Sequence, residues 1–197
     1  MVISKKISDS FSKSLADNKL IPDEYKESYS YCIELTLDIL IFNGSLILIG
    51  CFLHEFLNSL IFILALVPLK MVAGGAHANS RIGCSLISYG VFFSVILLSN
   101  IIPVNNFVFL IISALSCLGI VVLSPVDHPN KRFSDIQKHK LRKLSIIICL
   151  CLFITCIIMI QLRKPKFCFT ITTCLLVIFI NQIAGILINQ RRKTDDS

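Results

Sequence analysis

The sequence predicts an all-α integral membrane protein with about six transmembrane helices, preceded by an N-terminal amphipathic helix. Three observations lead to this prediction. Hydrophobic residues make up 55% of the 197 residues, charged residues gather in a few segments, and the stretches between them are long and apolar. A hydrocarbon core of about 30 Å requires about 20 apolar residues in a helix. We expect a single membrane domain with an interfacial segment at 1–30, a helical bundle at 31–190 and a cytoplasmic tail at 191–197.

The first 30 residues combine five Lys and five acidic residues with scattered Ile, Phe and Leu. This mixture is typical of an amphipathic helix that lies on the membrane surface, so we expect membrane lipid to be a partner here. The segment lacks the long apolar region of a secretory signal, so we expect no signal peptide.

The first two predicted spans carry polar residues. Residues 31–53 contain Glu34 and Asp38, and residues 56–69 form a short span that we expect to end near Pro68. His54 and Glu55 then fall in the turn between these spans and are expected to form a pair on the outer side. Ionisable residues inside spans are costly and usually functional.

The other four spans are free of charged residues. No Asp, Glu, Lys or Arg occurs between Arg81 and Asp127, a stretch long enough for two spans. Pro103, Asn105 and Asn106 predict the turn between them. Residues 144–162 and 167–190 supply the last two spans.

Basic residues predict the orientation. Six of the 19 lie in the 125–143 loop, and three more follow the last span. Short loops rich in Lys and Arg stay in the cytoplasm. We therefore expect both termini, the 70–85 segment and the 125–143 loop to be cytoplasmic. Three basic residues oppose this orientation because they would lie outside: Arg163, Lys164 and Lys166.

Eight of the nine cysteines lie in or against apolar stretches, where Cys acts as a small hydrophobe. No CxxC pair and no Cys/His spacing indicates a metal site. We expect no metal, no cofactor and no nucleic-acid partner.

The ninth cysteine, Cys84, lies with His77 in the Gly-rich 70–85 segment. A thiolate with a nearby imidazole is the minimum for thiol nucleophilic catalysis. On a straight helix the two residues would share a face but lie about 10.5 Å apart along the axis. Contact therefore requires a bend, which Ser80 and Gly83 permit. If a helix begins near Ser80, its N-terminal amides would favour the Cys84 thiolate. The alternative is an accidental proximity of one Cys and one His.

Residues 73–80, Ala-Gly-Gly-Ala-His-Ala-Asn-Ser, followed by Cys84, resemble the signature of the AgrB (accessory gene regulator B) membrane peptidases. The resemblance covers most of the chain. It includes a loop with Pro125, Asp127, Asn130 and Lys131 before a basic run. Lys70 stands where the family often has Arg; it keeps the charge but loses the planar fork of donors.

The resemblance implies a cysteine endopeptidase that processes an AgrD-like propeptide in quorum sensing. Cys84 would be acylated, and an internal Cys or Ser of the fragment would release a thiolactone or lactone ring. His77 would be the general base and acid, and Gly74 and Gly75 would allow the close backbone approach that a substrate or oxyanion needs. The resemblance is also compatible with a homodimer.

Further residues are candidates for supporting roles. Glu34 and Asp38 share a helix face and could orient His77, line a peptide path or pair across a helix interface. The alternative for Glu34 is that it lies in water near the start of its span. Lys131 and Arg132 could bind an acidic propeptide tail or meet anionic lipid. Asp127 could orient the histidine. Ser80 is expected to cap a helix rather than to attack a substrate.

Two other functions remain open at this stage. A small-peptide transporter without covalent chemistry would explain the spans and buried carboxylates, although no inverted repeat is found. A non-catalytic scaffold would leave the Gly-rich 70–85 segment unexplained.

Overall fold

The computed structural model describes residues 2–76, 81–101, 105–126 and 134–195. The chain is 89% helical, and its described residues form no strand. Six helices are long and apolar enough to cross a membrane. The prediction of an all-α protein with six potential spans is therefore confirmed. The chain packs as two compact units, residues 1–49 and 50–197.

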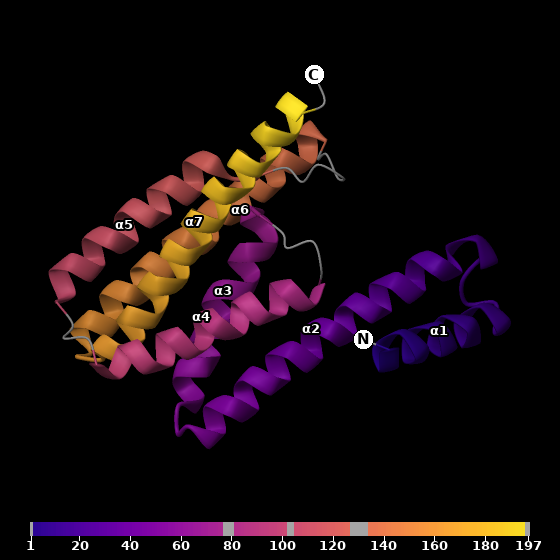
Figure 1. Cartoon of the computed structure of the whole chain (residues 1–197), viewed down its shortest axis with the longest axis horizontal. Coiled ribbons are helices and arrows are strands. Elements are labelled where there is room, and N and C mark those ends of the chain that lie inside the picture. The colour runs from indigo at the N-terminus through magenta and orange to yellow at the C-terminus, as the bar shows by residue number, and fades with distance from the viewer. Residues whose placement is uncertain (1, 77–80, 102–104, 127–133, 196–197) are drawn as a thin grey trace. The chain divides into compact units, whose positions relative to one another are not determined.

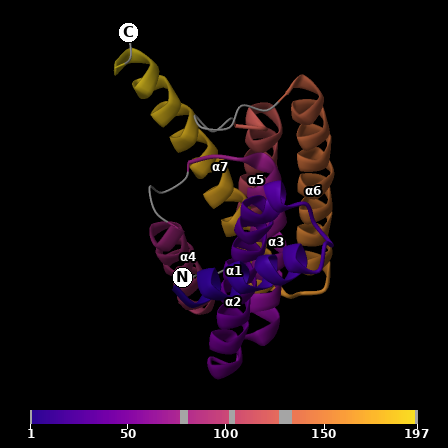
Figure 2. The ribbon, with the colours of Figure 1, turned by 90° about the vertical axis from the view of Figure 1, so that its right-hand side faces the viewer.

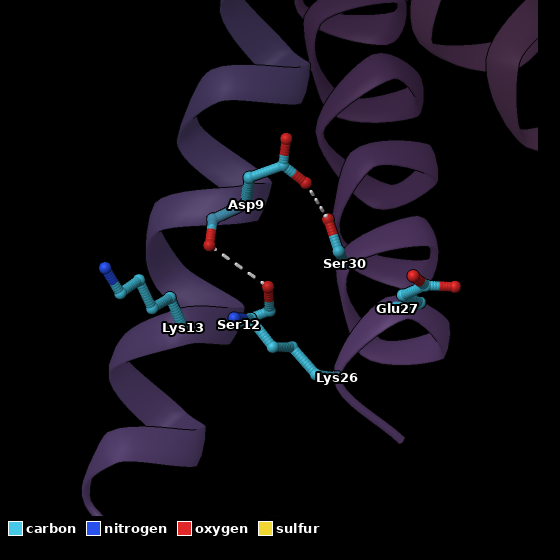
Figure 3. A pocket seen from close by; sticks show the side chains of 6 residues that line it. All are labelled: Asp9, Ser12, Lys13, Lys26, Glu27 and Ser30. Atoms are coloured by element: carbon cyan, nitrogen blue, oxygen red, sulfur yellow. Dashed lines mark hydrogen bonds between the residues drawn. The ribbon is translucent and has the colours of Figure 1, made fainter. Parts of the chain in front are cut away.

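The N-terminal unit is a helical hairpin. Helix α1 (Val2–Asp17) is followed by the short η1 (Asp23–Tyr25) and by α2 (Lys26–Phe52). Small residues recur at every fourth position of α1 and are buried: Ser4, Ser8, Ser12 and Ala16. Ser30 on α2 donates a hydrogen bond to Asp9 on α1 (2.6 Å; Figure 3). Ile7 and Phe11 are more than half exposed, which agrees with an apolar helix face available to lipid.

The second unit is built around one central helix, α7 (Pro165–Asp195). It packs against α3 (Phe56–Ala73), α4 (Arg81–Ile101), α5 (Asn106–Leu123) and α6 (Asp135–Gln161). Figure 1 shows α7 running along α5 and α6. In the turned view, α5 and α6 stand side by side (Figure 2).

Small residues let the helices of this unit approach closely. The buried residues of α5 are Ser113, Ser116 and Ile120, and those of α6 are Ser145, Cys149 and Cys156. Ser113 Oγ lies 2.8 Å from Thr172 Oγ1 of α7. Small and hydroxyl-bearing residues are typical of helix contacts in membranes. Large apolar side chains are instead exposed on all six long helices, as faces that meet lipid would be.

The structure corrects two sequence-based boundaries. Helix α3 does not end near Pro68 but continues through it to Ala73, so it includes Lys70. The basic run from Lys138 to Lys143 is not part of a loop, because α6 begins at Asp135. A capping box causes this early start: Ser134 and Gln137 each bond the backbone N–H of the other.

The turn after α2 also differs from the expectation. Glu55 forms an ion pair with Lys166 at the start of α7, rather than with His54. Lys166 Nζ also donates to Asn100 Oδ1 near the end of α4 (2.9 Å). One of the three basic residues that opposed the predicted orientation is therefore neutralised within the fold.

Candidate active site

Cys84 lies in the first turn of α4, which begins at Arg81. The sequence-based expectation of a helix start near Ser80 is therefore close to the observed one. Lys70, in the last turn of α3, donates a hydrogen bond from Nζ to Cys84 Sγ at 3.3 Å. Both side chains are half-buried. The ends of two consecutive helices thus bring an ammonium group against the candidate nucleophile.

The position of Lys70 follows from the packing of α3. Its neighbours Leu69, Val72 and Ala73 are buried, which leaves the long side chain of Lys70 to extend from the bundle at this turn. A cation in the last turn of a helix also interacts favourably with the carbonyl end of the helix dipole. The last turn of α3 therefore directs the Lys70 side chain toward the sulfur.

The chain leaves α3 through two glycines that both have positive φ. Gly74 has φ 70° and Gly75 has φ 138°, values that L-residues with a side chain rarely adopt. A Cβ on Gly74 would collide with the backbone carbonyl of Val126. A Cβ on Gly75 would collide with Asn181 of α7. Glycine is therefore required at both positions by the protein's own backbone.

Another glycine completes this contact from the side of α7. A Cβ on Gly185 would lie 2.7 Å from Ala76 N and 2.7 Å from Gly75 C. Because Gly185 has no side chain, residues 75–76 can approach α7 closely. The backbone N–H of Ala76 donates a hydrogen bond to the Asn181 carbonyl at 3.0 Å. The backbone of residues 75–76 thus packs directly against the backbone of α7.

The segment after α5 joins the same cluster. Val126 N donates to the Ala73 carbonyl at 3.0 Å, and Val126 pairs with Gly74 in a short parallel bridge. Gln182 of α7 donates from Nε2 to the Ala73 carbonyl and to Ser124 Oγ, each at 3.0 Å. Ser124 Oγ lies 2.9 Å from Ser145 Oγ of α6. One cluster therefore ties the ends of α3 and α5 to α6 and α7.

A known protein family matches most of this chain. The family model for AgrB, accessory gene regulator B, matches residues 4–186. The chain belongs to the AgrB family. No curated protein and no solved structure gives a match. Membership indicates an accessory gene regulator role in the processing of an autoinducing peptide, and the six apolar helices indicate a multi-pass membrane protein.

Within this AgrB-family chain, the structure describes only part of the predicted site. Cys84, Lys70, Gly74 and Gly75 are described and lie in two adjoining clusters at the same end of α3. Five predicted residues lie outside the described residues: His77, Ser80, Asp127, Lys131 and Arg132. Glu34 and Asp38 are half-buried on α2, in the N-terminal unit, and both have interaction partners.

Sequence reasoning missed the contribution of α7. Asn181, Gln182 and Gly185 contact a segment more than 100 residues earlier in the chain, and no local pattern encodes such a contact. One signal was present. Asn181 and Gln182 are adjacent amides inside a charge-free apolar stretch, where polar side chains require a partner.

A cleft of about 280 Å³ in the N-terminal hairpin is chemically different from this site. Figure 3 shows Lys13 and Lys26 on its walls together with Asp9 and Glu27. It holds no thiol or imidazole. Among the described residues, no group of three or more His, Cys, Asp or Glu could hold a metal ion.

Proposed function

We propose that this AgrB-family protein is a membrane cysteine endopeptidase that cleaves an AgrD-like propeptide through a thioester on Cys84. The observation that carries the proposal is the hydrogen bond from Lys70 Nζ to Cys84 Sγ at 3.3 Å. An ammonium group at this distance stabilises a thiolate, the species that attacks a carbonyl. Four of the other thiols are instead buried among helices: Cys149, Cys156, Cys168 and Cys174.

The proposed reaction has two acyl-transfer steps. The Cys84 thiolate attacks the scissile carbonyl, the C–N bond breaks, and the leaving amine takes up a proton. His77, assigned from the family signature, supplies that proton. Neutral His77 then takes the proton of a Cys or Ser side chain of the bound fragment. That side chain attacks the thioester, forms a thiolactone or lactone, and returns the thiolate to Cys84. With a Cys as the attacking group, one thioester replaces another and the acyl activation is kept.

Charge supports an acidic propeptide segment as the substrate. Four basic residues lie on the first turns of α6: Lys138, Lys140, Arg142 and Lys143. They precede Ser145, which contacts Ser124 in the cluster beside the site. Together with the net charge of +7, this arrangement attracts acidic peptides to this end of the bundle. Lys131 and Arg132 are proposed to bind the same acidic segment.

The site end of the bundle is proposed to face the cytoplasm, with both termini. Single-cysteine reporters test this orientation in a background that lacks the exposed native cysteines. A membrane-impermeant thiol reagent added to intact cells should label Lys164→Cys and leave Lys140→Cys unlabelled until the cells are opened. The reverse pattern would place the site outside.

Co-expression with a tagged AgrD-like propeptide tests the function. Wild type and Cys149→Ala, which alters a buried packing thiol, should both cleave the propeptide. Cys84→Ala and His77→Ala should leave it uncut although they insert into the membrane. An uncut propeptide with inserted wild-type protein would contradict the proposal and favour transport without covalent chemistry.

A further inference from the structure

Gln182 is a polar side chain with no solvent exposure, in the last span of the protein. A buried primary amide is costly unless its polar atoms are hydrogen-bonded. Its Nε2 uses both N–H groups, one toward the Ala73 carbonyl and one toward Ser124 Oγ. The orientation of the amide is fixed, because the Ala73 carbonyl can only accept and must face the nitrogen. Gln182 Oε1 has no partner among the described residues.

The Ala73 carbonyl accepts two hydrogen bonds, one from Gln182 and one from Val126 N. Both of its lone pairs are then used, and the last turn of α3 is held from two directions. Lys70 lies three residues before Ala73, on this same turn. An interaction that fixes the Ala73 carbonyl therefore also fixes the backbone from which Lys70 reaches Cys84.

We propose that Gln182 is a positioning residue for the Cys84 reaction, acting through the last turn of α3 and Lys70. The proposal rests on the proposed peptidase function. Gln182 does not touch the sulfur; it ties the end of α3 to α7 so that the ammonium of Lys70 stays within hydrogen-bond distance of the thiol. Further along the chain, the backbone of Gly75 and Ala76 packs closely against Gly185 of α7.

Gln182→Met tests the proposal, because Met has a similar length and neither donor. The matched control is Thr172→Val, on the same helix as Gln182 and ten residues before it, which removes a buried hydrogen bond to Ser113 of α5. Purified proteins are reconstituted in phospholipid vesicles and supplied with an AgrD-like propeptide. Gln182→Met should lower kcat by about tenfold or more and change KM by less than about twofold, since positioning affects the transition state more than substrate binding. Thr172→Val should keep both constants within about twofold of wild type.

A second readout needs no propeptide. The rate at which iodoacetamide alkylates Cys84 at neutral pH, measured by peptide mass spectrometry, reports how well Lys70 stabilises the thiolate. Gln182→Met should slow it severalfold, and Thr172→Val should not. If wild type fails to cleave the propeptide but Gln182→Met still slows alkylation, the peptidase function is wrong and the positioning role stands.

Ser124→Ala is a milder variant, because it removes one of the two acceptors of the Gln182 amide and leaves the hydrogen bond to the Ala73 carbonyl in place. Its effect should be smaller than that of Gln182→Met, and the double variant should be no worse than Gln182→Met alone. Wild-type kcat and alkylation in Gln182→Met would overturn the proposal. Equal losses in Gln182→Met and Thr172→Val would overturn it too, because they would indicate general loosening of the bundle.

Discussion

The two ends of the second unit are held together by different kinds of contact. Cys84 and Asn100 lie 16 residues apart on α4, or about 24 Å along a helix. Gln182 and Lys166 have the same separation on α7. At the Lys166 end, long charged side chains link α7 to α4 and to the turn before α3. At the site end, backbone meets backbone through glycines, and a buried amide bonds a carbonyl.

This difference has a functional meaning. A side-chain ion pair tolerates small shifts, because its long side chains can adjust and its charges act over several ångströms. Direct backbone contacts have no such freedom, and a displacement of 1 Å in an active site can cost about 100-fold in rate. The close packing is found at the end where Lys70 contacts Cys84, the contact on which the proposed function depends. The adaptable contacts are found about 24 Å away along the helices.

The largest effect is expected from adding a methyl group at the backbone contact. Gly185→Ala places a Cβ 2.7 Å from backbone atoms of Gly75 and Ala76, so one of the two segments must move. Propeptide cleavage should fall by about 100-fold or more, by the sensitivity of catalysis to misplacement. The rate is measured in vesicles with protein amounts matched by quantitative blotting.

Gly90→Ala on α4 is the matched control, because a Cβ there has no atom within 4 Å. It should cleave at the wild-type rate. Equal activity in Gly185→Ala and wild type would show that close packing of residues 75–76 against α7 is not needed for catalysis.

A smaller loss is expected when the ammonium beside the sulfur is removed. Lys70→Met keeps an apolar side chain of similar length but no longer stabilises a thiolate, so kcat should fall by about 10- to 100-fold. Lys70→Arg keeps the charge and should retain more activity than Lys70→Met. Steady-state kinetics at constant pH measures both. Activity in Lys70→Met above that in Lys70→Arg would show that charge is not what this position contributes.

The smallest effect is expected at the opposite end. The side chains of Lys166 and Glu55 are 30% and 15% exposed, and Lys166 keeps its hydrogen bond to Asn100 when Glu55 is made neutral. Glu55→Gln should lower the melting temperature in detergent only slightly and leave cleavage within about twofold of wild type. A loss of cleavage as large as that in Gly185→Ala would mean that both ends control the site equally.

Sequence patterns predict the helices of this fold better than the contacts between them. The charge-free stretches 144–162 and 167–190 predict spans because membrane crossing depends on local composition. The start of α6 was missed because a run of basic residues such as Lys138 and its neighbours is equally compatible with a loop and with an exposed helical turn. The continuation of α3 past Pro68 was missed because burial of Val72 and Ala73 stabilises the last turn, and burial is a tertiary property.

For the candidate site, too, the sequence predicts a residue better than its contacts. Cys84 could be chosen from the sequence because a thiol in a Gly-rich polar segment is unusual between two spans. The pairing of Lys70 with Cys84 could not, because it depends on how α3 and α4 are placed by packing. The glycines were expected to make room for a substrate. In the structure Gly74 and Gly75 make room for Val126 and Asn181, and a role toward the substrate stays a prediction.

The most direct test of the peptidase function is to trap the acyl-enzyme. A propeptide whose ring-closing Cys or Ser is replaced by Ala can still be cut but cannot cyclise, so the thioester should accumulate. Intact-protein mass spectrometry of wild type should then show a mass increase equal to the N-terminal propeptide fragment, mapped to the peptide that contains Cys84. Cys84→Ala should show neither cleavage nor adduct. Cleavage of this propeptide by Cys84→Ala, or an adduct mapped to another cysteine, would contradict the assignment of Cys84 as the nucleophile.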